Sequence, residues 1–361
     1  MLNGKKVALI TGIGGQDGSY LAEFLINKGY LVRGIIRRAS YPNTKRIDHL
    51  LKKYDDSCLD SPFIIKYADL TDPLSVKKII SLFQPDEIYN LAAQSHVGIS
   101  FENGESTLNI NCLGVYRILE ILREMEYKGK YYQASSSEMF GLSPPPQNES
   151  TPMLPQSPYG IAKLAAYHLT KLYREAYGLF ASNGILFNHE SPRRGINFVT
   201  KKITRELAEI LVGQRKKIIL GNLDAKRDWG FAGEYVQAMW LILQHNKPDD
   251  FVIATGESHT VREFLEECFS LIGLDKNKFF ESSDRYKRPA EVPALLGDST
   301  KAKKILGWNP KIKFKEIVKM MLVADLKEKF EECGIIPVDT KNEKSEEFYL
   351  EKARELAKKL N

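Results

Sequence analysis

The sequence predicts an α/β protein built on a doubly wound parallel sheet, with a smaller α/β lobe towards the C-terminus. In the first half of its 361 residues, short β-rich apolar runs alternate with longer helical stretches, as in βαβ units. A glycine-rich turn follows the first apolar run and opens the first helical stretch. After about residue 188 the alternation lapses, and loops rich in charges and glycine predict a substrate-facing lobe.

Six strands and four helices are expected in the first half. The strands are Lys6–Thr11, Leu31–Ile36, Phe63–Lys66, Glu87–Leu91, Tyr131–Ala134 and Gly184–Phe187, and the helices lie near Gly18–Lys28, Pro73–Phe83, Thr107–Glu126 and Pro158–Tyr177. In the second half we expect loops over His189–Asn197 and Gly221–Gly233, a helix over Glu234–Gln244, and a helix from a capping box at Thr260 to about Ile272.

Composition excludes several classes of protein. The 52 Lys and Arg exceed the 46 Asp and Glu by six, but the two signs are interspersed, which is a weak case for a nucleic-acid partner. The four cysteines are far apart and form no CxxC pair, so neither a disulfide framework nor a metal site is expected. No run approaches the roughly 20 apolar residues of a membrane span, and the N-terminus lacks an export signal. We therefore expect a cytoplasmic protein.

The glycine-rich turn has the spacing of a dinucleotide-binding loop. Gly12, Gly15 and Gly18 form a GxxGxxG pattern between a strand and a helix, where glycine lets the backbone approach a pyrophosphate and the helix N-terminus faces its negative charge. Arg37 and Arg38 stand where an NAD site usually has an acid, so NADP is the preferred cofactor. The alternative is that both are surface arginines or contact a neighbouring subunit.

These observations divide the chain into parts. We expect a Rossmann-type NADP-binding domain over residues 1–187, to which residues 221–256 return, and a mainly substrate-binding lobe over residues 188–330. Residues 331–361 are predicted to form a charged helical extension, with Tyr349, Ala353, Leu356 and Leu360 at helical spacing.

A chemical centre is predicted at the end of the fifth strand. Tyr159 and Lys163 lie one helical turn apart, so their side chains share a face, and the lysine charge is expected to lower the pKa of the phenol. The strand before this helix ends in Ser135-Ser136-Ser137-Glu138, and in a doubly wound sheet that strand end lies beside the nicotinamide. Together these residues predict acid and base catalysis next to a hydride acceptor.

These motifs resemble the extended short-chain dehydrogenase/reductase family, and within it the GDP-mannose 4,6-dehydratase family. The resemblance runs from about Lys6 to Trp308 and rests on TGIGGQDGSYLAEFL, YQASSSE, SPYGIAK, GILFNHESPRRG, GNLDAKRDWG, DFVIATG and RPAEVPALLGD. It implies a lyase that converts GDP-D-mannose to GDP-4-dehydro-6-deoxy-D-mannose through tightly bound NADP. Two positions depart from the family: Ser136 replaces the usual Thr, and Ser106 replaces a cofactor-contacting Tyr.

The resemblance also implies a role for each site residue. Tyr159 would take the proton of the sugar 4-hydroxyl, Ser136 would hydrogen-bond the 4-oxygen, Lys163 would support the phenol, and Glu138 would serve as base at C5 and acid at C6. The NADP site would comprise Gly12, Ile13, Gly14, Gly15, Gln16, Asp17, Arg37, Arg38, Ser40, Asp69, Leu70, Leu91, Ala92, Ala93, Gln94, Ser95, Tyr159, Lys163, His189 and Arg194. GDP would be held by Asn188, Lys202, Arg227, Arg288 and Glu291.

Three alternatives remain open from the sequence. One is a 4,6-dehydratase of another GDP-sugar, such as a heptose or an N-acetylhexosamine, and another is a related nucleotide-sugar epimerase or reductase. A third is an NADP-binding regulatory module, which would have no need for the complete set of Ser136, Glu138, Tyr159 and Lys163. The family resemblance implies a homodimer or homotetramer.

Overall fold

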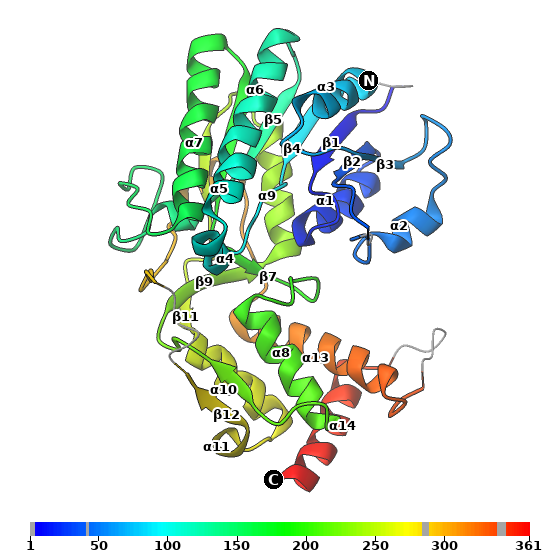
Figure 1. Cartoon of the computed structure of the whole chain (residues 1–361), viewed down its shortest axis with the longest axis vertical. Helices are drawn as coiled ribbons and strands as arrows, with labels where there is room; N and C mark the ends of the chain where they lie inside the picture. Colours follow the sequence, from blue (N-terminus) through cyan, green and yellow to red (C-terminus); the bar gives the residue numbers. More distant parts are fainter. Residues whose placement is uncertain (1–3, 41–42, 284–288, 338–343) are drawn as a thin grey trace.

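A parallel seven-stranded sheet forms the centre of the larger lobe (Figure 1). The computed structural model describes residues 4–40, 43–283, 289–337 and 344–361. The strands lie in the order β10-β6-β5-β4-β1-β2-β3, and each neighbouring pair is parallel. Their bounds are β1 Val7–Thr11, β2 Leu31–Ile36, β3 Phe63–Tyr67, β4 Glu87–Asn90, β5 Lys130–Ser136, β6 Phe180–Leu186 and β10 Asp250–Ile253. This order confirms the predicted doubly wound α/β fold.

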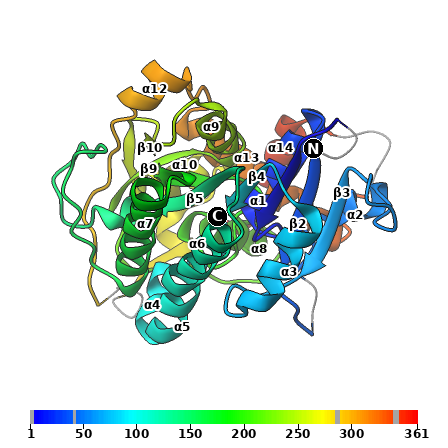
Figure 2. The ribbon, with the colours of Figure 1, turned by 90° about the horizontal axis from the view of Figure 1, so that it is seen from above.

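Helices cover both faces of this sheet because its strands are apolar on both sides. On β1, Ala8 and Ile10 pack into the cluster that holds helices α1 (Gln16–Asn27) and α9 (Ala232–Gln244), whereas Val7 and Leu9 point to the opposite face. That opposite face is covered by α3 (Pro73–Phe83), α6 (Gly114–Glu124) and α7 (Pro158–Tyr177), and the view from above shows the two layers (Figure 2). The short helices α2 (Asp48–Lys53) and α12 (Thr300–Leu306) complete the first layer.

The helix expected over Thr107–Glu126 is divided in the structure. A helix α4 (Val97–Glu102) is followed by α5 (Gly104–Leu108), a π-helical turn η1 (Asn109–Leu113) and then α6. A single-helix prediction is therefore wrong at its start. The periodicity of apolar residues cannot reveal one wider turn, because the flanking turns keep the α-helical spacing.

The smaller lobe has a core of its own. Four helices enclose it, α8 (Val199–Leu211), α10 (Val261–Ile272), α13 (Phe314–Glu332) and α14 (Glu346–Leu360), beside α11 (Lys276–Phe279) and a two-stranded sheet of β8 (Ile218–Leu220) and β12 (Phe280–Ser282). The α14 helix lies within the segment predicted as a charged extension. Its Tyr349, Leu350, Ala353 and Ala357 are buried in the lobe core, so α14 is an integral element rather than an appendage.

A three-stranded sheet joins the two lobes, and two of its strands lie where the sequence predicted only loops. The strands are β7 (Asn188–Glu190), β9 (Lys226–Phe231) and β11 (Ser258–Thr260), in the order β11-β9-β7. The loop predictions were wrong because both segments are polar and show no apolar alternation. In the folded protein, buried polar groups of these strands have hydrogen-bond partners. The Asp228 carboxylate of β9, for example, accepts hydrogen bonds from the backbone N–H groups of Thr255, Gly256 and Gly297.

The chain passes between the lobes several times. After β7 it builds α8 and β8 of the smaller lobe, returns through β9 to α9 and β10, and crosses again to α10. Residues 289–308 lie with the larger lobe, since Trp308 packs in its core and Gly297 lies against Ala254. We therefore propose domain limits that assign residues 289–308 to the larger lobe and residues 314–361 to the smaller lobe.

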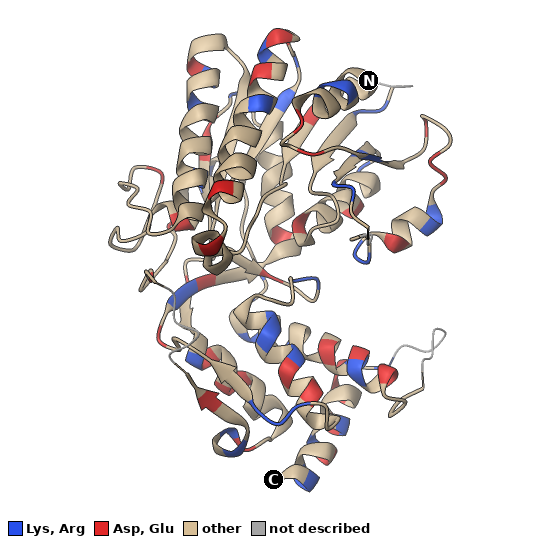
Figure 3. Cartoon of the chain, viewed as in Figure 1, with Lys and Arg blue, Asp and Glu red and all other residues tan. Residues whose placement is uncertain are grey.

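Charges of both signs are mixed over the ribbon of each lobe (Figure 3). Among the residues that the structure describes, no helix combines the length and the apolar character that crossing a membrane requires.

Candidate active site

A cavity of about 1490 Å³ lies between the lobes and brings most of the predicted site residues together. Its walls come from the β1–α1 turn, the carboxyl ends of β4, β5 and β6, the start of α7, and β7, α8 and β9. In an open parallel sheet the ligand crevice lies outside the carboxyl ends of the strands. The predicted residues that line it are Gly12, Gly14, Gly15, Gln16, Asp17, Arg37, Asp69, Leu70, Leu91–Ser95, Ser136, Glu138, Tyr159, Lys163, Asn188, His189, Arg194, Lys202, Arg227 and Glu291.

The glycine-rich turn forms a cradle that a side chain would fill. Gly12 has a φ of +69°, and a Cβ there would lie 2.9 Å from the Ala92 backbone. A Cβ on Gly14 would lie 2.5 Å from the Asn43 carbonyl oxygen. The next residue, Gly15, is the N-cap of α1 and offers no side-chain cap to the first N–H groups of the helix. The cradle therefore suits an anionic ligand at the helix N-terminus.

Three predicted cofactor residues do not line the cavity. Ile13 is fully buried, with its side chain against Gly34 of β2. The Arg38 guanidinium lies over the Tyr67 ring, 5.5 Å from its centroid, and Ser40 is exposed outside the cavity wall. The two neighbouring arginines thus differ in position, because only Arg37 faces the cavity.

A further basic residue of this wall, Arg46, was not predicted. Its Nε donates a hydrogen bond to the Arg193 carbonyl oxygen at 2.6 Å, and its Nη1 donates to the Gly14 carbonyl oxygen at 3.4 Å. No motif precedes Arg46, so only the folded chain shows that it lies beside the phosphate cradle. Ser106 of α5, one of the two family departures, also lines the cavity.

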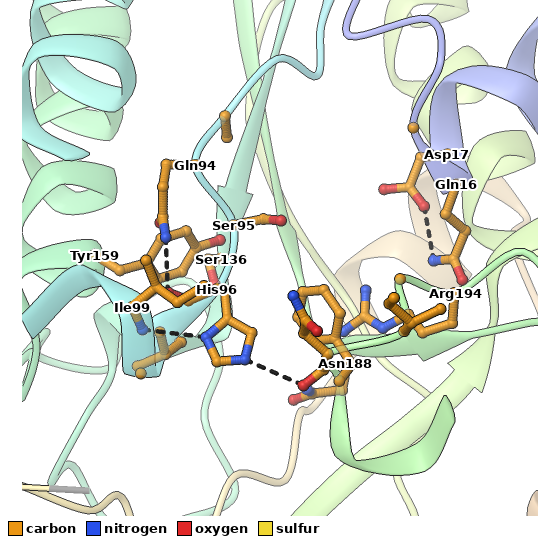
Figure 4. Close-up of a pocket in the computed structure, with 18 of the residues that line it drawn as sticks. Gln16, Asp17, Gln94, Ser95, His96, Ile99, Ser136, Tyr159, Asn188 and Arg194 are labelled. Carbon is orange, nitrogen blue, oxygen red and sulfur yellow. Dashed lines mark hydrogen bonds between the residues drawn. The ribbon is translucent and has the colours of Figure 1, made fainter. Parts of the chain in front are cut away.

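Four buried side chains form the chemical centre where β5 meets α7. Ser136 ends β5, and its hydroxyl caps the short 3-10 helix η2 (Ser137–Met139) by accepting from the Glu138 N–H at 3.2 Å. Tyr159 lies in the first turn of α7, and its hydroxyl hydrogen-bonds that of Ser136. Lys163 lies one turn further on, and its Nζ donates to the Ala134 carbonyl oxygen at 2.8 Å. Figure 4 shows Tyr159 and Ser136 on the opposite side of the cavity from Asp17 and Gln16.

Burial dominates the ionisation of this centre. It raises the pKa of Tyr159 to about 12, and the Ser136 hydrogen bond only partly opposes this rise, to which the Glu138 charge adds. Burial also lowers the pKa of Lys163 to about 8. The expectation that Lys163 lowers the pKa of Tyr159 was wrong for the protein alone, since the ammonium lies 5.8 Å from the centroid of the phenol ring and donates to Ala134.

Arg227 lies on β9, in the sheet that joins the lobes, and connects the chemical centre to the segment of residues 289–308. Its Nε lies 4.0 Å from Glu138 Oε1, and its Nη2 lies 3.1 Å from Glu291 Oε1. Its Nη1 donates to the Val292 carbonyl oxygen at 2.8 Å, so the guanidinium is fixed between both carboxylates.

The part of the cavity in the smaller lobe is lined by polar side chains of α8. Lys202 Nζ donates to the Ile219 carbonyl oxygen at 2.7 Å, and Asn188 lies across the cavity on β7. Arg205, Glu206, Glu209 and Arg215 also line this part and were not predicted. The helical spacing of Arg205, Glu206 and Glu209 on α8 was a usable signal, although it equally fits a solvated helix face, whereas Arg215 lies beyond the end of α8. Arg288 lies outside the described residues.

The fold and the site together define a Rossmann-type enzyme of the extended short-chain dehydrogenase/reductase class, with an added carboxylate at its chemical centre. Comparisons with known proteins narrow this class. The model of the GDP-mannose 4,6-dehydratase family matches residues 9–321. The chain is 57% identical to GDP-mannose 4,6 dehydratase 2 of Arabidopsis thaliana over 89% of this chain and 87% of the relative, and 52% identical to the human GDP-mannose 4,6 dehydratase over 89% and 92%.

Solved structures agree with this fold. A UDP-glucose 4-epimerase of Thermotoga maritima is 25% identical with a TM-score of 0.77, covering 89% of this chain and 99% of its own. A dTDP-glucose 4,6-dehydratase of Bacillus anthracis, at 20% identity and a TM-score of 0.76, covers 91% and 98% and shares the fold. The chain belongs to the GDP-mannose 4,6-dehydratase family.

Proposed function

We propose that this protein converts GDP-D-mannose to GDP-4-dehydro-6-deoxy-D-mannose with loss of water, using NADP. The observation that carries this proposal is the position of the Glu138 carboxylate, buried beside Ser136 and Tyr159 in the cavity that also holds the phosphate cradle. The activities of the family members named above support it. An epimerase or reductase needs the hydroxyl and phenol but not this additional acid and base.

The residues present fit a nicotinamide dinucleotide. The Gly12 and Gly14 cradle leaves room for a pyrophosphate against the N-terminus of α1, and Arg37 provides a cation where a 2′-phosphate would lie. A bound nicotinamide would supply the chemistry of hydride transfer, as acceptor for the hydride of C4 and donor to C6 of the hexose. Arg37 supports NADP rather than NAD.

The protein's own groups move the protons of the reaction. Tyr159 takes the proton of the 4-hydroxyl, while Ser136 donates a hydrogen bond to the 4-oxygen and holds the hexose in place. Oxidation at C4 acidifies the C5 hydrogen, which Glu138 removes. Glu138 then protonates the departing 6-hydroxyl, so that water leaves. The Lys163 ammonium, 5.8 Å from the centroid of the phenol ring, would place a positive charge near the phenol during this proton transfer.

The smaller lobe and the sheet that joins the lobes supply the groups that would hold GDP. Lys202 and Arg227 offer positive charge to the diphosphate, and Asn188 offers an amide. Arg227 lies between Glu138 and Glu291, so the same guanidinium that meets the diphosphate also faces the catalytic carboxylate.

A panel of GDP-, UDP- and dTDP-sugars with NADP tests the proposal. We expect GDP-mannose to lose the mass of one water without net accumulation of NADPH. Loss of water from a GDP-heptose or a GDP-N-acetylhexosamine alone would shift the assignment to that sugar. Epimerisation or net reduction of NADP, with no loss of water from any sugar, would refute a dehydratase.

We also propose that the chain forms a homodimer or homotetramer. The adjoining elements α5, η1, α6 and α7 expose large apolar side chains, namely Leu108, Leu113, Tyr116, Leu172 and Tyr177, and a second copy of the chain would cover them. Light scattering, which measures the molar mass in solution, of the wild type and of Leu113→Asp tests both the assembly and the face that forms it. A monomeric wild type would refute the assembly, and an unchanged oligomer in the variant would exclude this face.

A further inference from the structure

The phosphate cradle contains an acid, which is an unfavourable neighbour for a pyrophosphate. Asp17 stands in the first turn of α1, lines the cavity, and directs its side chain towards β7. A carboxylate at this place adds a negative charge where the helix N-terminus should attract one. A positively charged group is therefore needed beside Asp17 to neutralise this charge when a dinucleotide binds.

His189 of β7 is placed to be this group, because its ring lies in contact with the Asp17 carboxylate. Its Nε2 lies 2.8 Å from Asp17 Oδ2, and its Nδ1 lies 2.8 Å from the Phe187 carbonyl oxygen. A carbonyl oxygen and an ionised carboxylate are acceptors only, so both contacts become hydrogen bonds when both ring nitrogens carry a proton, as in an imidazolium. The side chains of both residues are mostly buried, and the Tyr235 ring stacks on the imidazole at 4.7 Å. This arrangement fixes the ring in place.

Gln16 holds the pair formed by Asp17 and His189 in place through hydrogen bonds to both residues and to Ser191. Its Nε2 donates to Asp17 Oδ1 at 3.0 Å and to the His189 carbonyl oxygen at 3.0 Å, while its Oε1 accepts from the Ser191 hydroxyl at 2.8 Å. One of the dashed lines in Figure 4 marks the contact between Gln16 and Asp17. The pair thus ties the first turn of α1 to the strand that enters the smaller lobe.

The charges around the pair support this ionisation. Burial opposes a charged ring, but the charge and hydrogen bond of Asp17 outweigh it and raise the pKa of His189. The same contact lowers the pKa of Asp17. The other charged or titratable groups that act on Asp17 and His189 are Arg194 and Glu190, which pair with each other at 3.0 Å, together with Lys163, Tyr132 and Tyr159, while Tyr235 contacts the imidazole by stacking.

We propose that His189 is a positioning residue that neutralises Asp17, so that the first turn of α1 can bind the cofactor pyrophosphate while remaining attached to β7. This inference rests on the proposed function, because it assumes a dinucleotide in the cradle. It assigns the two side chains to each other, and leaves phosphate binding to the backbone N–H groups of the turn.

A double-mutant cycle on cofactor affinity tests this assignment. The NADP dissociation constants of wild type, His189→Gln, Asp17→Asn and the double variant are measured by calorimetry at one pH. Loss of the imidazolium leaves Asp17 uncompensated, so His189→Gln should weaken NADP on the order of tenfold. Removal of the acid should restore most of that loss in the double variant. A direct contact between His189 and the cofactor predicts no rescue and would overturn the proposal.

A second measurement does not depend on the ligand. The ring signals of His189, assigned by their loss in His189→Gln, should report an imidazolium at pH 7.5 in the wild type by NMR and should titrate at lower pH in Asp17→Asn. A neutral wild-type ring would overturn the proposal even if all variants fold. His49→Gln removes an exposed histidine that lies 2.7 Å from Glu23, and serves as the matched control with unchanged affinity.

The outcomes separate this inference from the proposed function. A wild type that binds neither NADP nor NAD contradicts the function, whereas tight binding without rescue in the double variant contradicts only the role of the pair.

Discussion

Replacing Arg37 with alanine should remove most of the preference for NADP over NAD. Arg37 lines the cavity at the end of β2, whereas Arg38 lies over the Tyr67 ring and outside the cavity wall. Two unit charges 4 Å apart interact by about 1 kcal/mol in water and about 4 kcal/mol at an effective dielectric constant near 20. Because Arg37 is exposed, its interaction energy with a 2′-phosphate should lie near the lower of these two values. We expect Arg37→Ala to weaken NADP binding by about 1–2 kcal/mol, which corresponds to a loss of about 5–30-fold in affinity.

The assay compares dissociation constants for NADP and NAD in the wild type, Arg37→Ala and Arg38→Ala. NAD affinity should change little in either variant, because NAD lacks the 2′-phosphate. Added salt should narrow the wild-type preference, since exposed charges are screened. Arg38→Ala is the matched control, a neighbouring arginine with the same charge. An equal loss of preference in both variants, or none in Arg37→Ala, would refute the argument from position.

Three further predictions concern catalysis and stability. Glu138→Gln should abolish loss of water but keep the exchange of hydride between C4 and the cofactor, measured with a 4-deuterated sugar; equal loss of both would remove the proposed role. Lys163→Met should reduce kcat yet raise thermal stability at pH 7 by up to about 3 kcal/mol, because burial lowers the pKa of Lys163 from 10.5 to about 8. That penalty is complete below pH 8 and shrinks as pH rises towards 10.5, so the stability difference should narrow over this range; a constant difference would argue against a buried charge. Leu350→Ala should cost about 2–4 kcal/mol in denaturant unfolding, since Leu350 is 1% exposed, whereas Leu82→Ala, at an exposed leucine of α3, should cost little; equal effects would contradict the placement of α14 in the core.

The larger lobe was predictable because its signals are local. The apolar runs of β1 to β6 carry their own periodicity, and Gly12 has a positive φ that few other residues tolerate. Likewise, Tyr159 and Lys163 lie on one helix, so their spacing alone brings them together.

The junction between the lobes was not predictable, because its determinants are distant in sequence. The β9 strand is polar, and the partners that satisfy Asp228 come from residues 255, 256 and 297. Arg46 reaches the cradle only through the carbonyl groups of Gly14 and Arg193. The pKa of Tyr159 was predicted in the wrong direction because burial depends on the whole fold.

The repeated passage of the chain between its lobes limits how such an enzyme can be rebuilt. The segment after β7, the returns through β9 and residues 289–308, and the final helices α13 and α14 alternate between the two cores. No single cut separates one lobe from the other, so a recombinant hybrid that exchanges the smaller lobe needs several crossovers at once. New sugar preferences are therefore more accessible to point substitution along the cavity wall than to shuffling of contiguous blocks. The same interleaving predicts that the lobes melt in one cooperative transition.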